Sequence, residues 1–85
     1  LLQRVEISLD FIDFMLENYP GKLEGFYGVK EEGTDVEILE GIGEIRKCLK
    51  KGEEVDLEKA AALLLDDFRN ARLGKISLEF PEKEG

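Results

Sequence analysis

Basic side chains gather at two places in an otherwise acidic chain, and several cations presented together can hold nucleic-acid phosphates. The chain has 85 residues and a formal net charge of −8. One cluster consists of Arg46, Lys47, Lys50 and Lys51. The other consists of Arg69, Arg72 and Lys75. Each falls at the end of a predicted helix, where the helix dipole favours a cation by about 0.3–1 kcal/mol without any ligand. The two basic clusters can therefore serve helix-end stabilisation or phosphate binding, and the sequence leaves both alternatives open.

The other reactive residue types indicate no catalytic or metal site. The adjacent acidic pairs are Asp66-Asp67, Glu31-Glu32 and Glu53-Glu54. Neighbouring residues do not converge on a substrate, so these pairs are expected to be solvated surface. The chain has no His and one cysteine, Cys48, which excludes an internal disulfide and an ordinary zinc site. We expect Cys48 to be a small buried hydrophobe, and we expect no catalytic residue, metal or cofactor in this segment.

The best-defined helix that carries these residues is predicted over 56–73. Asp56 can cap its first turn, and Gly74 can take the left-handed conformation that closes its last turn. At about 100° per residue, one narrow arc of this helix is apolar. Its members are Leu57, Ala61, Leu64, Phe68 and Ala71. This arc must face a core, and we expect Leu64 and Phe68 to be nearly fully buried.

A second helix is predicted over 35–50. Thr34 and Glu37 have the spacing of a capping box, and Gly52 ends the apolar pattern. Gly41 and Gly43 lie inside this helix, where each costs about 1 kcal/mol relative to alanine. They therefore predict close packing against a neighbouring segment. The loop 29–33 before this helix is expected to be exposed.

The first helix is predicted over 2–18 and ends at Pro20-Gly21, because the residue before proline leaves the helical conformation. It has two apolar stripes on nearly opposite sides. One stripe is accounted for by packing in the core of the domain, and the other contains Ile7, Phe11 and Phe14. These three residues either pack within the domain or dock against a preceding domain; we take them as candidate interdomain residues. A short helical turn is predicted over 22–27.

These elements predict an all-α fold: a small bundle of three main helices with a short helical turn and an extended C-terminal tail. We expect one helical domain over 1–80 and a frayed tail over 81–85. No apolar run could span a bilayer and no signal-peptide pattern opens the chain, so we expect a cytoplasmic protein without membrane contact. The sequence begins at Leu1 within a helical pattern, which suggests a piece of a longer chain.

Residues at fixed intervals along most of the chain resemble the end of the YlqF/RbgA family of ribosome-assembly GTPases. The resemblance is carried by the run 52–61, Leu64-Leu65, Phe68-Arg69, the run 73–79, Tyr19-Pro20, Leu23, Tyr27-Gly28-Val29, Ile45-Arg46 and Cys48-Leu49. The sequence departs from the family at Lys47 and Ala71, where glycine is more often expected. Ala71 would allow the last helix to continue by about one turn.

This resemblance implies an all-helical C-terminal domain that contacts ribosomal RNA on the immature large (50S) subunit. It also implies an N-terminal GTPase domain elsewhere in the parent protein, which binds GTP and magnesium. The segment itself has no phosphate-binding loop, since Gly41-Ile42-Gly43 lacks the Lys-Ser/Thr that such a loop requires. Both basic clusters are then candidate RNA-binding residues. The alternative is a helical bundle that binds a partner protein and makes no RNA contact.

Overall fold

The structure is a computed structural model that describes residues 4–74 and residue 76. Its helices are α1 (Arg4–Asn18), α2 (Lys22–Tyr27), α3 (Asp35–Ile45), the short 3-10 helix η1 (Lys51–Glu53) and α4 (Leu57–Arg69). Across these residues, the single β pairing is an antiparallel bridge between Leu49 and Val55. The all-α prediction is confirmed. The tail predicted beyond residue 76, including 81–85, lies outside the described residues.

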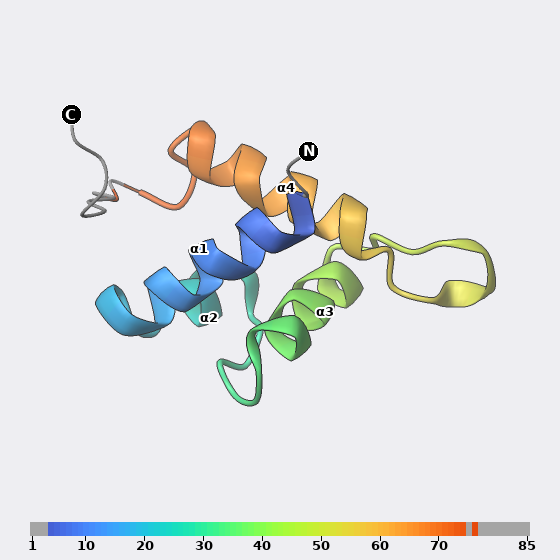
Figure 1. Ribbon diagram of the computed structural model, residues 1–85, viewed down its shortest axis with the longest axis horizontal. Coiled ribbons are helices and arrows are strands. Elements are labelled where there is room, and N and C mark those ends of the chain that lie inside the picture. The colour runs from blue at the N-terminus through green and yellow to red at the C-terminus, as the bar shows by residue number, and fades with distance from the viewer. Residues whose placement is uncertain (1–3, 75, 77–85) are drawn as a thin grey trace.

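The three longer helices pack against one another around a common core. Helix α1 contacts both α3 and α4, α3 contacts α4, and α2 packs on α1. Figure 1 shows α1 crossing the centre of the molecule between α4 and α3, while the loop with η1 extends away from the helices. The most completely buried side chains come from all four α-helices; they are Ser8, Ile12, Met15, Leu23, Ile38, Leu39, Ile42 and Leu64.

The core face of α1 lies between the two stripes predicted from the sequence. Its buried residues are Ser8, Phe11, Ile12 and Met15. Phe11 is 5% exposed and packs on Phe68, with ring centroids 4.8 Å apart. Of the two alternatives left open for Phe11, packing within the domain is the one found, because Phe68 of α4 covers its ring. Phe68 is half-buried, not nearly fully buried, whereas Leu64 is fully buried as predicted.

The N-terminal caps predicted for α3 and α4 are confirmed. Thr34 accepts from the backbone N–H of Glu37, whose carboxylate accepts in return from the backbone N–H of Thr34. Asp56 accepts from the backbone N–H of Lys59. One acidic side chain expected to be merely solvated also has such a role: the carboxylate of Glu31 accepts from the backbone N–H groups of Gly21 and Glu24 at 2.9 Å each.

The helices predicted over 35–50 and 56–73 both end one turn or more before their expected C-termini. Helix α3 ends at Ile45 instead of residue 50, and α4 ends at Arg69 instead of residue 73. The residues Lys47 and Ala71 adopt left-handed backbone conformations, with φ of 61° and 58°. The next backbone N–H then turns back onto the helix: Cys48 donates to the carbonyl of Gly43 and Arg72 to that of Asp67. Each helix is closed by this Schellman pattern, and Ala71 does not extend α4.

The glycines inside α3 mark close packing, as predicted. A Cβ atom at Gly43 would lie 2.7 Å from Cγ1 of Val55, and one at Gly41 would lie 2.6 Å from Cγ2 of Val29. Val29 is itself buried, so the loop 29–33 is not exposed throughout. Cys48 is buried, as expected for a small hydrophobe.

Candidate nucleic-acid interface

The guanidinium of Arg46 lies over two aromatic rings of α2. Its central carbon is 4.9 Å from the ring centroid of Tyr27 and 5.6 Å from that of Phe26. Arg46 occupies the C-cap position of α3, where the backbone leaves the helical path. The helix end therefore directs a cation onto the aromatic pair, and this contact stabilises the positive charge through the ring quadrupoles.

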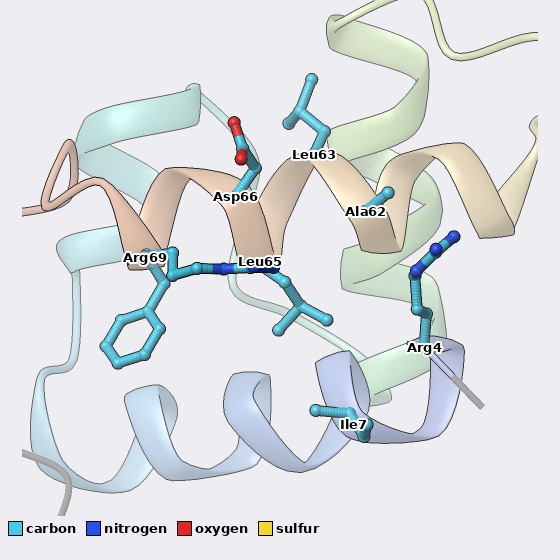
Figure 2. A pocket seen from close by; sticks show the side chains of 8 residues that line it. Arg4, Ile7, Ala62, Leu63, Leu65, Asp66 and Arg69 are labelled. Carbon is cyan, nitrogen blue, oxygen red and sulfur yellow. The ribbon is translucent and has the colours of Figure 1, made fainter. Parts of the chain in front are cut away.

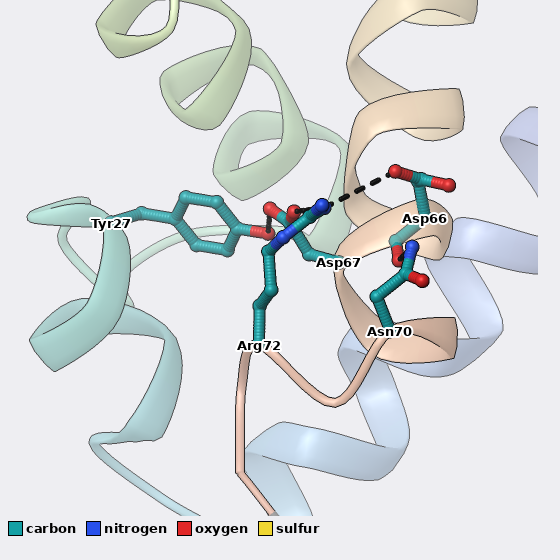
Figure 3. A network of polar contacts seen from close by, with 5 residues as sticks. All are labelled: Tyr27, Asp66, Asp67, Asn70 and Arg72. Carbon is teal, nitrogen blue, oxygen red and sulfur yellow. Dashed lines mark hydrogen bonds and ion pairs between the residues drawn. The ribbon is translucent and has the colours of Figure 1, made fainter.

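The hydroxyl of Tyr27 connects this aromatic pair to the end of α4. Tyr27 donates to Oδ2 of Asp67 at 2.7 Å, and Nη1 of Arg72 donates to Oδ1 of the same carboxylate at 3.0 Å. Arg72 also pairs with the exposed carboxylate of Asp66 at 3.2 Å. Figure 3 shows the carboxylate of Asp67 between the hydroxyl of Tyr27 and the guanidinium of Arg72.

The environment of Tyr27 raises the pKa of its hydroxyl far above the usual value. Burial is the main cause, followed by the hydrogen bond to Asp67 and the charge of that carboxylate. Arg46 and Arg72 oppose the shift, which places both cations within electrostatic range of one phenol. The structure thus brings together one arginine from each basic cluster, with Tyr27 between them.

The sequence analysis expected Asp67 on the solvated surface, and this expectation is wrong. It is 6% exposed, while its neighbour Asp66 is exposed as predicted. The helical position of Asp67 held the signal that was missed: it follows Leu64 by three residues and Ala60 by seven, and therefore shares their buried face. Buried carboxylates need partners, which Tyr27 and Arg72 provide.

The lysines of the first cluster project from the loop between α3 and α4. Lys47, Lys50 and Lys51 are all exposed. The loop is held closed by the bridge between Leu49 and Val55 and by two backbone hydrogen bonds of 2.7 Å. Those bonds run from Lys50 to Glu54 and from Asp56 to Cys48. The lysines therefore extend from an ordered base that is continuous with Arg46.

The second cluster is divided between two sides of α4. Arg69 is exposed and lies two positions after Asp67, about 200° around the helix. It lines an open groove between α1 and α4 with a volume of about 750 Å³, away from Tyr27. Lys75 lies outside the described residues. Of the predicted RNA-binding residues, the structure therefore places Arg46 and Arg72 around one centre, the three lysines on the adjoining loop, and Arg69 elsewhere.

The groove is formed mostly by apolar side chains from two helices (Figure 2). Arg4 and Ile7 come from α1, and Ala62, Leu63, Leu65, Asp66, Phe68 and Arg69 come from α4. Ile7 is 38% exposed at this surface. Of the three candidate interdomain residues, Ile7 is thus exposed, Phe14 is half-buried and Phe11 belongs to the core. Two α4 residues with other predicted roles also line the groove: Phe68 was predicted in the core and Arg69 in the RNA-binding set.

Two kinds of site are not found among residues 4–74 and 76. No group of three or more His, Cys, Asp or Glu side chains is placed to hold a metal ion in this region. None of the helices described there has the length and apolarity needed to cross a membrane.

Comparison with known proteins shows the relationship of the chain. Ribosome biogenesis GTPase A of Bacillus cereus is 34% identical over 86 residues, which cover all of this chain and 29% of that protein. The protein of the same name from Priestia megaterium is 30% identical over 84 residues, with 98% and 29% covered. The chain belongs to the YlqF/RbgA family. The resemblance drawn from the sequence is confirmed.

The family relationship concerns one part of a longer protein. The chain spans less than a third of the length of these relatives and matches their C-terminal part. An uncharacterised GTP-binding protein of Methanocaldococcus jannaschii is also similar, with 35% identity over 57 residues that cover 67% of this chain and 15% of that protein. No protein-family model matches the chain.

Proposed function

We propose that this chain is the C-terminal RNA-contacting domain of a GTPase that assists assembly of the large ribosomal subunit in the cytoplasm. Its relatives are named ribosome biogenesis GTPase A, and the chain corresponds to their C-terminal part. GTP and magnesium are bound by an N-terminal GTPase domain of the parent protein. The helical C-terminal domain binds the immature subunit and supplies no catalytic residue.

The observation that carries RNA contact is that one arginine of each basic cluster, Arg46 and Arg72, lies beside Tyr27. Arg46 and Arg72 flank Tyr27, and Lys47, Lys50 and Lys51 continue the surface from Arg46 into the adjoining loop. In a chain with a net charge of −8, Arg46 and the three lysines are exposed cations close together in sequence, which suits local contact with phosphates. Arg69 extends this surface only if RNA passes around the end of α4, and Lys75 stays a proposed RNA-binding residue from the sequence alone.

The test is binding of the full-length protein to immature large subunits at several salt concentrations. The variant Arg46→Gln/Lys50→Gln/Lys51→Gln removes three charges and leaves the ion pairs of Arg72 intact. Each lost phosphate contact should flatten the slope of log affinity against log salt by about 0.7–0.9, because fewer counterions are released. The matched control, Lys22→Gln/Lys30→Gln/Lys59→Gln, removes three charges outside both clusters and should leave the slope unchanged.

Unchanged affinity and salt slope in the first variant would contradict RNA contact through this surface. The helical domain would then be better described as a protein-interaction module, whose apolar groove offers the docking surface. We propose in either case that Ile7 and the adjoining groove face the preceding GTPase domain.

A further inference from the structure

Phe26 is an exposed aromatic side chain that lies next to Arg46. It is 37% exposed, and its ring meets the buried ring of Tyr27 edge-on, with centroids 4.8 Å apart and an interplanar angle of 87°. Tyr27 is in turn fixed by its hydrogen bond to Asp67. The orientation of Phe26 is therefore set by a chain of contacts that reaches into the core.

Arg46 is held at this place by aromatic rings instead of acids. Throughout the part of the chain that the structure describes, the ion pairs all involve Arg72, so Arg46 has no carboxylate partner there. Its guanidinium carbon lies within 5.6 Å of the ring centroids of both Phe26 and Tyr27. A guanidinium in a cation–π contact keeps N–H donors available, and phosphate oxygens match those donors well.

We propose that Phe26 and Arg46 form a stacking site for an unpaired RNA nucleotide, with the base on the aromatic–guanidinium pair and a phosphate on Arg46 or the neighbouring lysines. This inference rests on the proposed function and specifies the form of RNA that the surface selects. Unstacked bases bind to aromatic rings and to arginine planes, whereas duplex base pairs hide their faces in the helical stack. The site therefore favours single-stranded loops or bulges over duplex.

The experiment uses the full-length protein and two fluorescein-labelled probes followed by anisotropy. One probe is a 12-nucleotide RNA without self-complementarity, and the other is the 12-base-pair duplex of that sequence. Phe26→Leu keeps an apolar side chain but removes the ring. It should weaken single-strand binding by about tenfold, which is the lower part of the range for one lost base–aromatic stack. Duplex affinity and the salt slope should stay unchanged.

Two further variants separate stacking from charge and from general apolar surface. Arg46→Lys keeps the charge but loses the planar group, so it should weaken single-strand binding while the salt slope is retained. Val36→Ala removes an apolar side chain of the same exposure, 37%, from α3 and should have no effect. Circular dichroism of each variant checks that the helices are retained; Arg46→Lys remains decisive if Phe26→Leu fails to fold.

The outcomes distinguish this inference from the proposed function. If Phe26→Leu and Arg46→Lys leave single-strand binding unchanged, or if Val36→Ala weakens it equally, the stacking site is refuted. RNA contact still stands in that case if Arg46→Gln/Lys50→Gln/Lys51→Gln weakens binding of both probes. If this triple variant changes neither affinity, or if the unmodified protein binds neither probe, both proposals fail.

Discussion

Asp67 is the residue on which the polar centre of the domain depends. Its carboxylate is buried at the end of α4 and accepts from Tyr27 on one oxygen and from Arg72 on the other. A buried carboxylate that loses a partner bears the cost of desolvation without compensation, so each bond matters more than an exposed pair would. The Arg72–Asp66 pair has both side chains more than half exposed and contributes little.

Removing the hydroxyl of Tyr27 tests this account. Tyr27→Phe should lower the free energy of unfolding of the 85-residue chain at neutral pH by about 1.5–3 kcal/mol, the usual contribution of a hydrogen bond to a charged group. The raised pKa of Tyr27 means that the folded state keeps the proton after the unfolded chain has lost it near pH 10. Its contribution to stability is therefore fully present below pH 10 and declines as pH rises further.

The measurement is urea denaturation of both proteins between pH 7 and pH 11. The difference in unfolding free energy between the unmodified chain and the Tyr27→Phe variant should be constant up to about pH 10 and then shrink, because phenylalanine does not titrate. Asp66→Asn is the control, since it alters an exposed carboxylate that also pairs with Arg72. A difference that grows above pH 10, or a loss in Asp66→Asn as large as that in Tyr27→Phe, would contradict the assignment.

At the scale of the elements, both α3 and α4 end on a residue other than glycine in a left-handed conformation. Lys47 and Ala71 occupy these positions, and they are the places where the family resemblance leads us to expect glycine. The Cβ atom makes this conformation about 1–2 kcal/mol less favourable for an L-residue. The backbone hydrogen bonds that close the two turns offset this cost. The same turns direct Arg46 and Arg72 away from their helices and toward Tyr27.

Ala71→Gly should therefore stabilise the 85-residue chain, by about 0.5–1 kcal/mol once the greater entropy of the unfolded glycine chain is included. The same substitution at Ala62, in the interior of α4, is the matched control and should destabilise by about 1 kcal/mol. Thermal unfolding followed by circular dichroism measures both. Equal destabilisation by the two variants would show that the conformation at residue 71 carries no strain.

Local signals made the helix starts predictable and left the helix ends uncertain. The caps at Thr34 and Asp56 need only residues within the first turn, and the sequence identified both. Lysine and alanine carry no local signal for a left-handed turn, so residues 47 and 71 looked helical. The burial of Asp67 could have been read from its helical spacing to Ala60 and Leu64, but its partner could not, because Tyr27 is 40 residues away and lies beside it only after α2 packs. The approach of Arg46 and Arg72 to Tyr27 likewise depends on tertiary packing, which local sequence signals do not reveal.

Across the whole molecule, the polar centre around Tyr27 and the apolar groove are formed by different helix pairs and adjoin at Asp66, which lines the groove and pairs with Arg72. Arg46 lies over Phe26 and Tyr27, and Arg72 meets Tyr27 through Asp67 (Figure 3). The groove instead runs between α1 and α4 (Figure 2). Arg4 and Ile7, near the start of α1, line that groove. The relatives have more than two thirds of their length outside the matched C-terminal part. A preceding domain joined ahead of α1 would enter beside the groove.

The last prediction is that the groove is uncovered only when this domain is separated from the rest of its protein. The 85-residue chain should then self-associate as its concentration rises, because pairing two copies would remove the apolar lining of the groove from water. Ile7→Gln/Leu65→Gln changes one residue on each side of the groove and should shift sedimentation toward the monomer. Val36→Gln/Ile45→Gln, which alters two exposed apolar residues of α3, should leave association unchanged. In the full-length protein, the groove variant should instead increase protease cleavage ahead of α1, since the two domains would separate more often. A strictly monomeric 85-residue chain, together with unaltered cleavage of that full-length variant, would mean that nothing docks in the groove.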